Sequence, residues 1–263
     1  MVINTNLINK TAIITGGSKG IGWETAKVML EEGMKVVLVS RNEKILASRL
    51  KELINYEANV RIFPSDLSIP TSAEEISNFC LSQFNKIDIL VNSAGAAKGG
   101  SFSEILDKDW EEAFNLKFFG TIRMIRSVLP YMKKQRSGNI INIVGDTGKK
   151  PNKLMLPGSS INASLLSITS GLSDELGEFR IRINAISPGP TKTDRIVNMF
   201  ESLAKSTNKP IQQIEDDFLK DNAIKQLADP KEIANLILYL SSDISYNITG
   251  TEIKSDGGRS RFL

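Results

Sequence analysis

The sequence predicts an α/β fold, a doubly wound and mainly parallel seven-stranded sheet with helices on both faces. Short runs rich in valine and isoleucine alternate with segments of helical spacing along the 263 residues. Most strand candidates are short and predominantly apolar, which is typical of strands covered on both sides. With 41% hydrophobic residues the chain can build one large core, so we expect residues 1–263 to form a single domain.

The expected strands come at regular intervals: Thr11–Thr15, Lys35–Ser40, Val60–Phe63, Ile87–Asn92, Asn139–Val144, Ile181–Ser187 and Thr251–Lys254. Apolar residues at helical spacing predict the helices between them: Ile21–Glu32, Glu43–Tyr56, a segment from Ser72 to Phe84, Lys108–Lys134, Ser159–Leu176 and a helix from Pro230 onward. Residues 194–226 are polar and helical in pattern and interrupt the alternation. They would lie at the carboxyl ends of the strands, so we interpret them as a substrate lid.

Composition excludes several classes of function. The net charge is only +3, from 33 basic and 30 acidic residues without a dense basic run, so we expect no nucleic-acid partner. The absence of histidine removes the commonest metal ligand, and the carboxylates form no ligand-like cluster, so no metal is expected. No long apolar run occurs, which favours a cytoplasmic protein without a membrane partner.

A glycine-rich turn joins the first strand to the first helix in the sequence TGGSKGIG, residues 15–22. Glycines at this place allow a tight turn and a close approach of the backbone to a pyrophosphate. The free N–H groups of the following helix point at the same anion. The position of the motif within a βαβ unit therefore predicts a dinucleotide site made by Gly16, Ser18, Lys19, Gly20, Ile21 and Gly22.

The residues after the second strand indicate which dinucleotide binds. NAD-specific sites place an acidic side chain there, on the ribose hydroxyls. This chain has Ser40 and Arg41 instead, with Lys19 in the glycine loop. Two cations near the adenosine ribose favour a 2′-phosphate. We therefore expect NADP(H) as the preferred cofactor, with NAD(H) as the alternative.

These motifs, with Asn92-Ser93-Ala94-Gly95 and with Pro188-Gly189 followed by Thr191 and Thr193, resemble the short-chain dehydrogenase/reductase (SDR) family over about residues 7–258. The resemblance implies a Rossmann-like fold, a small-molecule substrate and a homotetramer or homodimer. It also implies further cofactor-binding residues: Asp66 and Leu67 at the adenine, then Asn92, Ala94, Gly95, Asn162, Pro188, Gly189, Thr191 and Thr193. Asn115 falls in the helix where the family keeps an active-site asparagine.

The catalytic segment departs from the family. The positions of its serine, tyrosine and lysine are held here by Gly145, Gly158 and Asn162, and none of the four tyrosines lies in this stretch. The usual tyrosine–lysine proton-transfer pair is therefore missing. Asn115, Ser159 and Asn162 remain as candidate catalytic residues. The expected substrate-binding residues are Gly145, Asp146, Arg195 and Gly158, which leaves a gap of the size of a tyrosine.

The loss of the acid favours one kind of reaction. Hydride addition to a carbonyl produces an alkoxide, which needs a positioned acid. Addition to a C=C conjugated with a carbonyl produces an enolate, which hydrogen-bond donors can stabilise. The run GNIINIVGDTGKKP and Thr193-Asp194-Arg195 resemble an atypical SDR branch that includes a conjugate reductase of bacilysin biosynthesis. We expect an NAD(P)H-dependent reductase of an activated C=C or an unusual carbonyl. The alternative is a catalytically inactive dinucleotide-binding protein that serves as a sensor or subunit.

Overall fold

The computed structural model describes residues 4–261. Its seven strands form one sheet in the order β3-β2-β1-β4-β5-β6-β7, and every neighbouring pair is parallel. The strands are β1 (Thr11–Thr15), β2 (Lys35–Ser40), β3 (Val60–Pro64), β4 (Ile89–Asn92), β5 (Gly138–Ile143), β6 (Ile181–Pro188) and β7 (Glu252–Ser255). The predicted fold class is confirmed, and the predicted strands differ from the observed ones by two residues at most.

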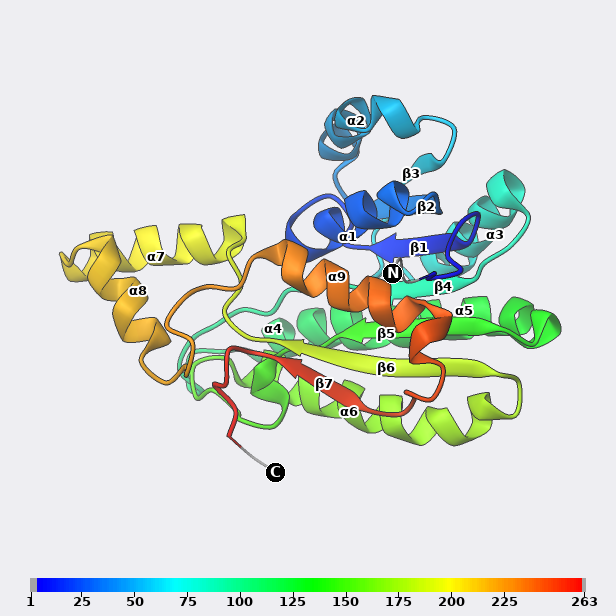
Figure 1. Ribbon diagram of the computed structural model, residues 1–263. Helices are drawn as coiled ribbons and strands as arrows, with labels where there is room; N and C mark the ends of the chain where they lie inside the picture. Colours follow the sequence, from blue (N-terminus) through cyan, green and yellow to red (C-terminus); the bar gives the residue numbers. More distant parts are fainter. Residues whose placement is uncertain (1–3, 262–263) are drawn as a thin grey trace.

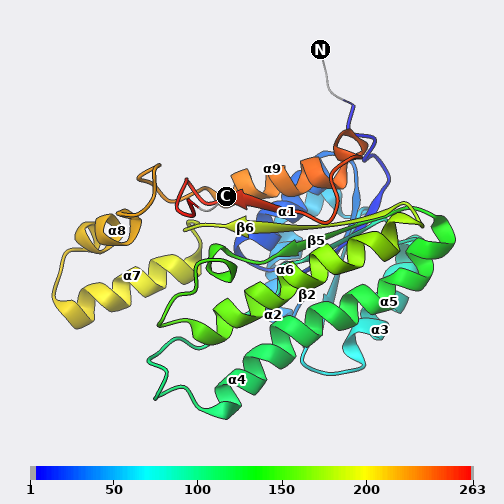
Figure 2. The same ribbon diagram turned by 90° about the horizontal axis from the view of Figure 1, so that it is seen from below.

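Helices cover both faces of the sheet (Figures 1 and 2). One face is packed by α1 (Gly20–Glu31), α2 (Glu43–Glu52) and α9 (Pro230–Ser241). The opposite face is packed by α3 (Ser72–Phe84), α5 (Gly120–Gln135) and α6 (Leu156–Gly177). Each face has its own apolar cluster, because buried strand residues point alternately to the two sides. This arrangement brings the carboxyl ends of β1, β4, β5 and β6 to one edge.

The long helix expected over Lys108–Lys134 contains a π-helical turn. The chain runs through α4 (Asp107–Ala113), a π-helical turn η2 (Phe114–Phe119) and then α5. A π turn adds a residue to one helical turn and rotates the side chains beyond it, and such turns are frequent at functional sites. The predicted extent of the helical segment is confirmed, whereas the π turn within it, which positions the residues described below, was not predicted.

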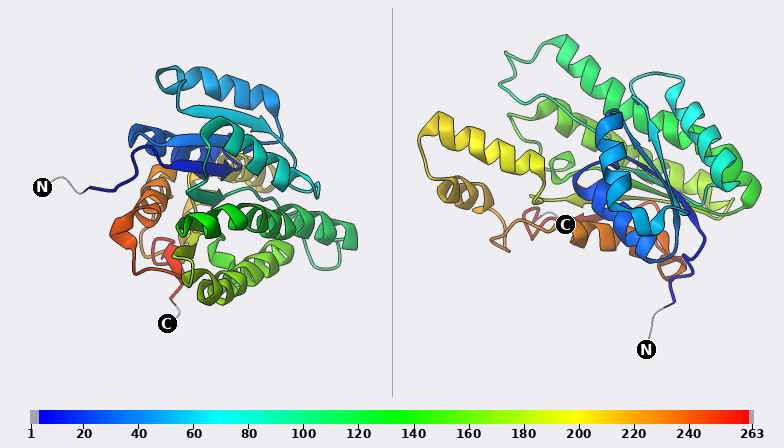
Figure 3. Two further views of the ribbon diagram at one scale, coloured as in Figure 1. Left: turned by 90° about the vertical axis from the view of Figure 1, so that its right-hand side faces the viewer. Right: turned by 90° about the horizontal axis from the view of Figure 1, so that it is seen from above.

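The segment interpreted as a lid contains α7 (Asp194–Thr207) and α8 (Ile211–Leu219). The two helices pack on each other through Ile196, Phe200 and Ile214. Figure 1 and the right-hand view of Figure 3 show the pair projecting from the body at the end where the strands terminate. The remaining elements are short 3₁₀ turns: η1 (Ile54–Tyr56), η3 (Asp146–Gly148) and η4 (Asp243–Ser245). Among residues 4–261, no helix has the length and apolar composition needed to cross a bilayer.

Candidate active site

The glycine loop has the geometry of an anion cradle. Gly16 has φ +68°, and a Cβ there would lie 2.9 Å from the backbone of Ser93 and Ala94. A Cβ at Gly22 would lie 2.6 Å from the carbonyl oxygen of Gly16. The helix α1 begins without a side-chain cap from Lys19 and without an acidic residue in its first turn. Its first N–H groups and its positive dipole end are therefore available to a phosphate.

Basic and hydroxyl groups surround the expected ribose position. The Ser18 hydroxyl donates to that of Ser40 at 2.9 Å, and the Arg41 side chain is exposed, 3.9 Å from the Asp66 carboxylate. Lys19 is exposed beside them. The sequence interpretation missed Arg49, which donates to the carbonyl of Ser18 at 3.0 Å and so fixes the loop. The structure thus places Ser18, Lys19 and Arg41 at the same end of the sheet.

The other predicted cofactor-binding residues differ in their position relative to the glycine loop. A Cβ at Gly20 would lie 3.0 Å from Cγ2 of Thr193, so the Pro188–Thr193 segment borders the glycine loop. The Asn92 side chain points inward and donates to Asn142 at 2.9 Å, and its role in cofactor binding stays a prediction. Its neighbour Ala94 donates its N–H to Thr15, and the buried Leu67 packs in the core.

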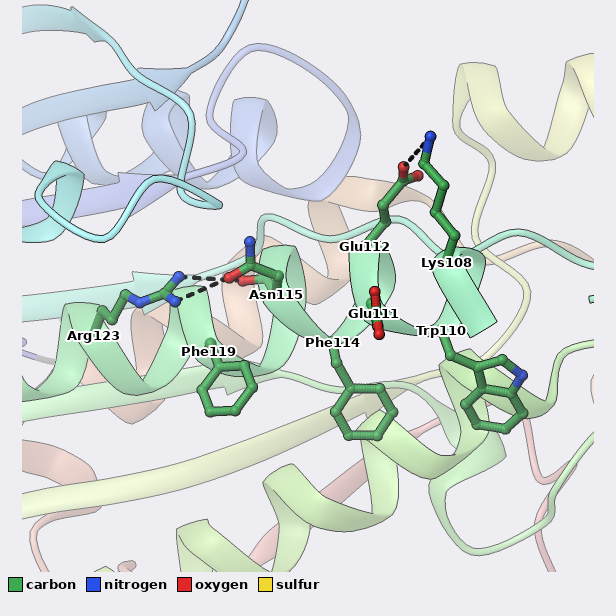
Figure 4. A pocket seen from close by; sticks show the side chains of 8 residues that line it. All are labelled: Lys108, Trp110, Glu111, Glu112, Phe114, Asn115, Phe119 and Arg123. Carbon is green, nitrogen blue, oxygen red and sulfur yellow. Dashed lines mark hydrogen bonds and ion pairs between the residues drawn. The ribbon is translucent and has the colours of Figure 1, made fainter. Parts of the chain in front are cut away.

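The predicted catalytic asparagine, Asn115, lies on the outer side of the π turn. Its amide donates to the carbonyl of Ser68 at 3.0 Å and accepts from Arg123 at 2.9 Å. Figure 4 shows it with Arg123 on a groove of about 730 Å³ that is also lined by Trp110, Phe114 and Phe119. Both ends of the amide are thus used away from Ser159 and Asn162. The structure does not bring Asn115 together with the other predicted catalytic residues.

Lys117, from the same π turn, takes the inner position. Its ammonium donates to the Asn162 side-chain oxygen at 2.6 Å and to the carbonyl of Val144, at the end of β5, at 2.7 Å. Its stem crosses Gly95, where a Cβ would lie 2.6 Å from the lysine Cδ. No residue with a side chain could stand at Gly95 unless the lysine moved. The structure therefore places a cation beside the residue that replaces the family's lysine.

The environment makes this lysine a usable acid near neutral pH. Burial and, less strongly, the positive charge of Arg195 together lower the pKa of Lys117 from 10.5 to about 8. Desolvation disfavours the ammonium form, while the two oxygen acceptors favour it. The Lys117 residue is partly exposed. A group with a pKa of about 8 exchanges protons efficiently at physiological pH.

Asn162 connects Lys117 to the loop after β5. It is 6% exposed, accepts from Lys117 through Oδ1 and donates to the Thr147 hydroxyl at 2.9 Å. Both ends of the Asn162 amide are therefore engaged, and its role in cofactor binding stays a prediction. Sequence analysis missed Lys117 because no motif includes it. The available signal was a single lysine within the aromatic run FNLKFF, residues 114–119.

The two glycines at the family's serine and tyrosine positions lie in different surroundings, and only one of them has a backbone conformation that favours glycine. Gly145 has φ +126°, which strains any other residue, and a Cβ there would lie 2.9 Å from the Asn162 amide nitrogen. Gly158 has ordinary helical geometry. A Cβ there would meet only Ala97 at 3.5 Å and Met155 at 3.9 Å, which are normal contacts. A Cβ therefore fits at Gly158, between two apolar side chains and one helical turn from Asn162.

Three other predicted residues are placed as follows. The Ser159 hydroxyl donates to the carbonyl of Met155 and accepts from the N–H of Asn152, so it stabilises the helix start, and its role in catalysis stays a prediction. Asp146 pairs with Arg259 at 3.3 Å, and its role in substrate binding stays a prediction. Arg195 is exposed at the start of α7, and its charge acts on Lys117.

Comparisons with known proteins agree with this geometry. The sequence matches the family described as short chain dehydrogenase over residues 10–204. It is 32% identical over 252 residues to the 2,3-dihydro-2,3-dihydroxybenzoate dehydrogenase of Bacillus subtilis, covering 95% of each chain. The fold is similar to YwfH, an NADPH-dependent reductase involved in bacilysin biosynthesis, with TM-score 0.91 and 27% identity over 97% of this chain and 100% of that one.

A second solved structure extends the likeness to a sugar reductase. The L-sorbose reductase of Gluconobacter frateurii, solved with NADPH and L-sorbose, aligns with TM-score 0.94 at 27% identity over 99% of this chain and 100% of that one. The family match covers most of the chain, including the dinucleotide loop and the segment around Lys117 and Asn162. The chain therefore belongs to the short-chain dehydrogenase family and is an NAD(P)-dependent oxidoreductase.

Proposed function

We propose that this enzyme uses NADPH to reduce a C=C bond conjugated with a carbonyl, or an unusual carbonyl, with Lys117 as the proton donor. One observation carries the proposal: the Lys117 ammonium lies on Asn162, and its pKa is lowered to about 8. A cation at this place can stabilise and protonate an oxygen that becomes negative during the reaction. The missing tyrosine is then replaced by a lysine from another helix.

NADPH, when bound, supplies the hydride that adds to the β-carbon of the enone. Lys117 donates a hydrogen bond to the substrate oxygen, on which the enolate charge develops, and transfers its proton to the product. Asn162 and the carbonyl of Val144 hold the ammonium in place. The substrate gains one hydride and one proton, and the neutral lysine is reprotonated from solvent. Arg195 is proposed to pair with a carboxylate of the substrate.

The preference for NADPH rests on charge and on relatives. Ser18, Lys19 and Arg41 offer hydroxyl and cationic donors where a 2′-phosphate would lie, and no acidic residue follows β2 directly. Both YwfH and the L-sorbose reductase are described with NADPH. Asp66 is the nearby carboxylate, and its ion pair with Arg41 would exchange for one between Arg41 and phosphate.

The family resemblance also implies self-association, as a homodimer or homotetramer. The groove along α4, η2 and α5 exposes Phe119, which is 47% exposed and whose ring centroid lies 5.6 Å from the Arg123 guanidinium. An aromatic groove of this kind is typical of a protein–protein interface. We propose that a second copy of the chain covers it.

The test is a titration of the protein with NADPH and NADH, followed by turnover. Cofactor fluorescence gives the two dissociation constants, and a panel of cyclic enones, enone acids and simple ketones is then added. We expect tighter binding of NADPH and oxidation with conjugated substrates. Binding without oxidation on any substrate class would favour the inactive dinucleotide-binding protein instead. Absence of binding to both cofactors would contradict the site itself.

A further inference from the structure

Ion pairs connect the loop at residues 146–150, beside Asn162, to residues 218–224 at the end of the lid, directly or through Arg259. The first residue of that loop, Asp146, opens the 3₁₀ turn η3, and Oδ2 of its carboxylate lies 3.3 Å from Nε of Arg259. The two side chains are 20% and 17% exposed, so solvent screens their interaction little. The next residue, Thr147, accepts the hydrogen bond from Asn162.

The turn η3 also packs directly on the proton-donor site. A Cβ at Gly148 would lie 3.2 Å from Cβ of Asn162, so the turn and the helix α6 are in close contact. A shift of η3 would therefore move the Thr147 hydroxyl away from the Asn162 amide. Because Asn162 holds the Lys117 ammonium, its orientation depends on this turn.

The other end of Arg259 holds the lid. Its guanidinium donates to the carbonyl of Phe218, in α8, at 3.1 Å and to the Asn222 side chain at 3.3 Å. It also lies over the Phe218 ring at 5.0 Å. A planar guanidinium with several donors suits this simultaneous contact, which a lysine could make only in part. One side chain thus bonds both the lid and the loop beside the proton donor.

The backbone around Arg259 is built to present it. Gly257 and Gly258 have φ +63° and +74°, which glycine adopts readily. The carbonyl of Gly257 accepts the N–H groups of Ala223 and Ile224, both at 2.9 Å, just after α8. Asp256 accepts the N–H groups of Gly258 and Ser260 through its two carboxylate oxygens. The C-terminal segment is therefore fixed to the end of the lid.

We propose that Arg259 is a positioning residue that links the seating of α8 to the placement of Asn162 and hence of the Lys117 proton donor. The inference rests on the proposed role of Lys117. When the 218–224 segment is seated, Arg259 holds Asp146 and η3 against α6. When that segment moves, Arg259 moves with it and the Thr147 support of Asn162 is lost. Chemistry then proceeds efficiently only with the lid end in place.

The kinetic test compares full-length variants with the preferred enone. Arg259→Met is expected to lower kcat about tenfold while the dissociation constant for NADPH stays within about twofold, since a misplaced donor affects the chemical step. Arg259→Lys should recover part of the loss. The matched control is Asp221→Asn, which removes an exposed ion pair between the same lid end and Lys150 of the same loop, and it should stay within about twofold.

A second variant guards against misfolding. Arg259→Met leaves the half-buried Asp146 carboxylate without its ion-pair partner, whereas Asp146→Asn combined with Arg259→Met removes that charge as well. If the coupling acts through this pair, the double variant folds and has the same kcat as Arg259→Met alone. A wild-type kcat in Arg259→Met, or equal losses in kcat and in NADPH affinity, would overturn the inference.

Hydrogen exchange separates this inference from the proposed function, because it needs no turnover. In Arg259→Met we expect faster amide exchange at 146–150 and at 218–224 together, compared with the wild type and with Asp221→Asn. If no substrate is reduced by the wild type, the proposed function fails, and joint acceleration still supports the coupling. Unchanged exchange at 146–150 would overturn it even in an active enzyme.

Discussion

Lys117 concentrates the chemistry of this site in one side chain. A lysine enters a half-buried position at a cost, since its charged form loses hydration. Two oxygen acceptors, on Asn162 and Val144, offset part of that cost, and the pKa settles at about 8. If Lys117 is the proton donor, this loss of stability accompanies an acid whose pKa suits neutral pH, a combination that is common at active sites.

The first prediction concerns the effect of Lys117 on how the free energy of unfolding depends on pH. Its folded-state pKa of about 8 is below the unfolded value of 10.5, so between these values the unfolded chain binds more protons and stability rises with pH. The free energy of unfolding of the wild type should therefore rise relative to Lys117→Met between pH 8 and 10.5, by at most about 1.4 kcal/mol per pH unit. Urea unfolding at several pH values measures it, and a parallel pH dependence of the two proteins would contradict the shift.

The second prediction concerns the open space at Gly158. Leucine there would fill the gap between Ala97 and Met155, so a ring-shaped enone should lose access. We expect the KM of Gly158→Leu for cyclic enones to rise about tenfold while NADPH affinity is kept. Gly171→Leu is the matched control, because Gly171 is on the same helix and a Cβ there meets nothing within 4 Å. Equal KM values for the two variants would place the substrate elsewhere.

At the scale of elements, the turn after β5 explains why the serine is missing. Gly145 occupies a backbone region that disfavours every residue with a side chain, and Asn162 fills the space beside it. The turn and the start of α6 therefore form one unit built around the Lys117–Asn162 pair. Restoring a single family residue would disturb this unit.

The third prediction follows from that turn. Gly145→Ser should lower the free energy of unfolding by about 1–3 kcal/mol, because of the strained backbone and the contact with Asn162. Turnover should fall too, because Asn162 is displaced. Urea unfolding and steady-state kinetics provide the two readouts. A serine variant as stable as the wild type and more active would show that the glycine is incidental.

At the same scale, some features could be predicted from the sequence and others could not. The glycine loop, the parallel strands and Arg41 followed from local patterns, and the structure places them at one edge of the sheet. The roles of Asn115 and Lys117 did not. Both residues lie in the π turn, which adds one residue to a helical turn. It is therefore Lys117, and not Asn115, that contacts Asn162. Periodicity of 3.6 residues carries no sign of such a turn.

At the scale of the whole molecule, long-range contacts decided what the sequence could not. Asp146 pairs with Arg259, which lies more than one hundred residues later in the chain, and Asn92 bonds Asn142 across the sheet. No local pattern predicts these partners. The helical character of residues 194–226 could be predicted because they interrupt the alternation of strands and helices, whereas the contact with Arg259 required the tertiary structure.

The fourth prediction concerns assembly. If a second copy covers the groove, Phe119→Glu should place a charge in the interface and dissociate the oligomer. Light scattering after size-exclusion chromatography measures the mass. Ile54→Glu is the control, since Ile54 is also exposed but lies in η1, outside the groove. A wild-type protein of monomer mass would contradict the proposed interface, as would a Phe119→Glu protein of unchanged oligomer mass.

The most direct test of the account is the turnover of Lys117→Met, measured as NADPH oxidation with the preferred enone at pH 7 beside a titration of NADPH binding. If Lys117 is the proton donor, kcat falls about 100-fold or more while the dissociation constant for NADPH stays within about twofold. A kcat close to that of the wild type would contradict the central claim, because the proton would then come from another group or from water.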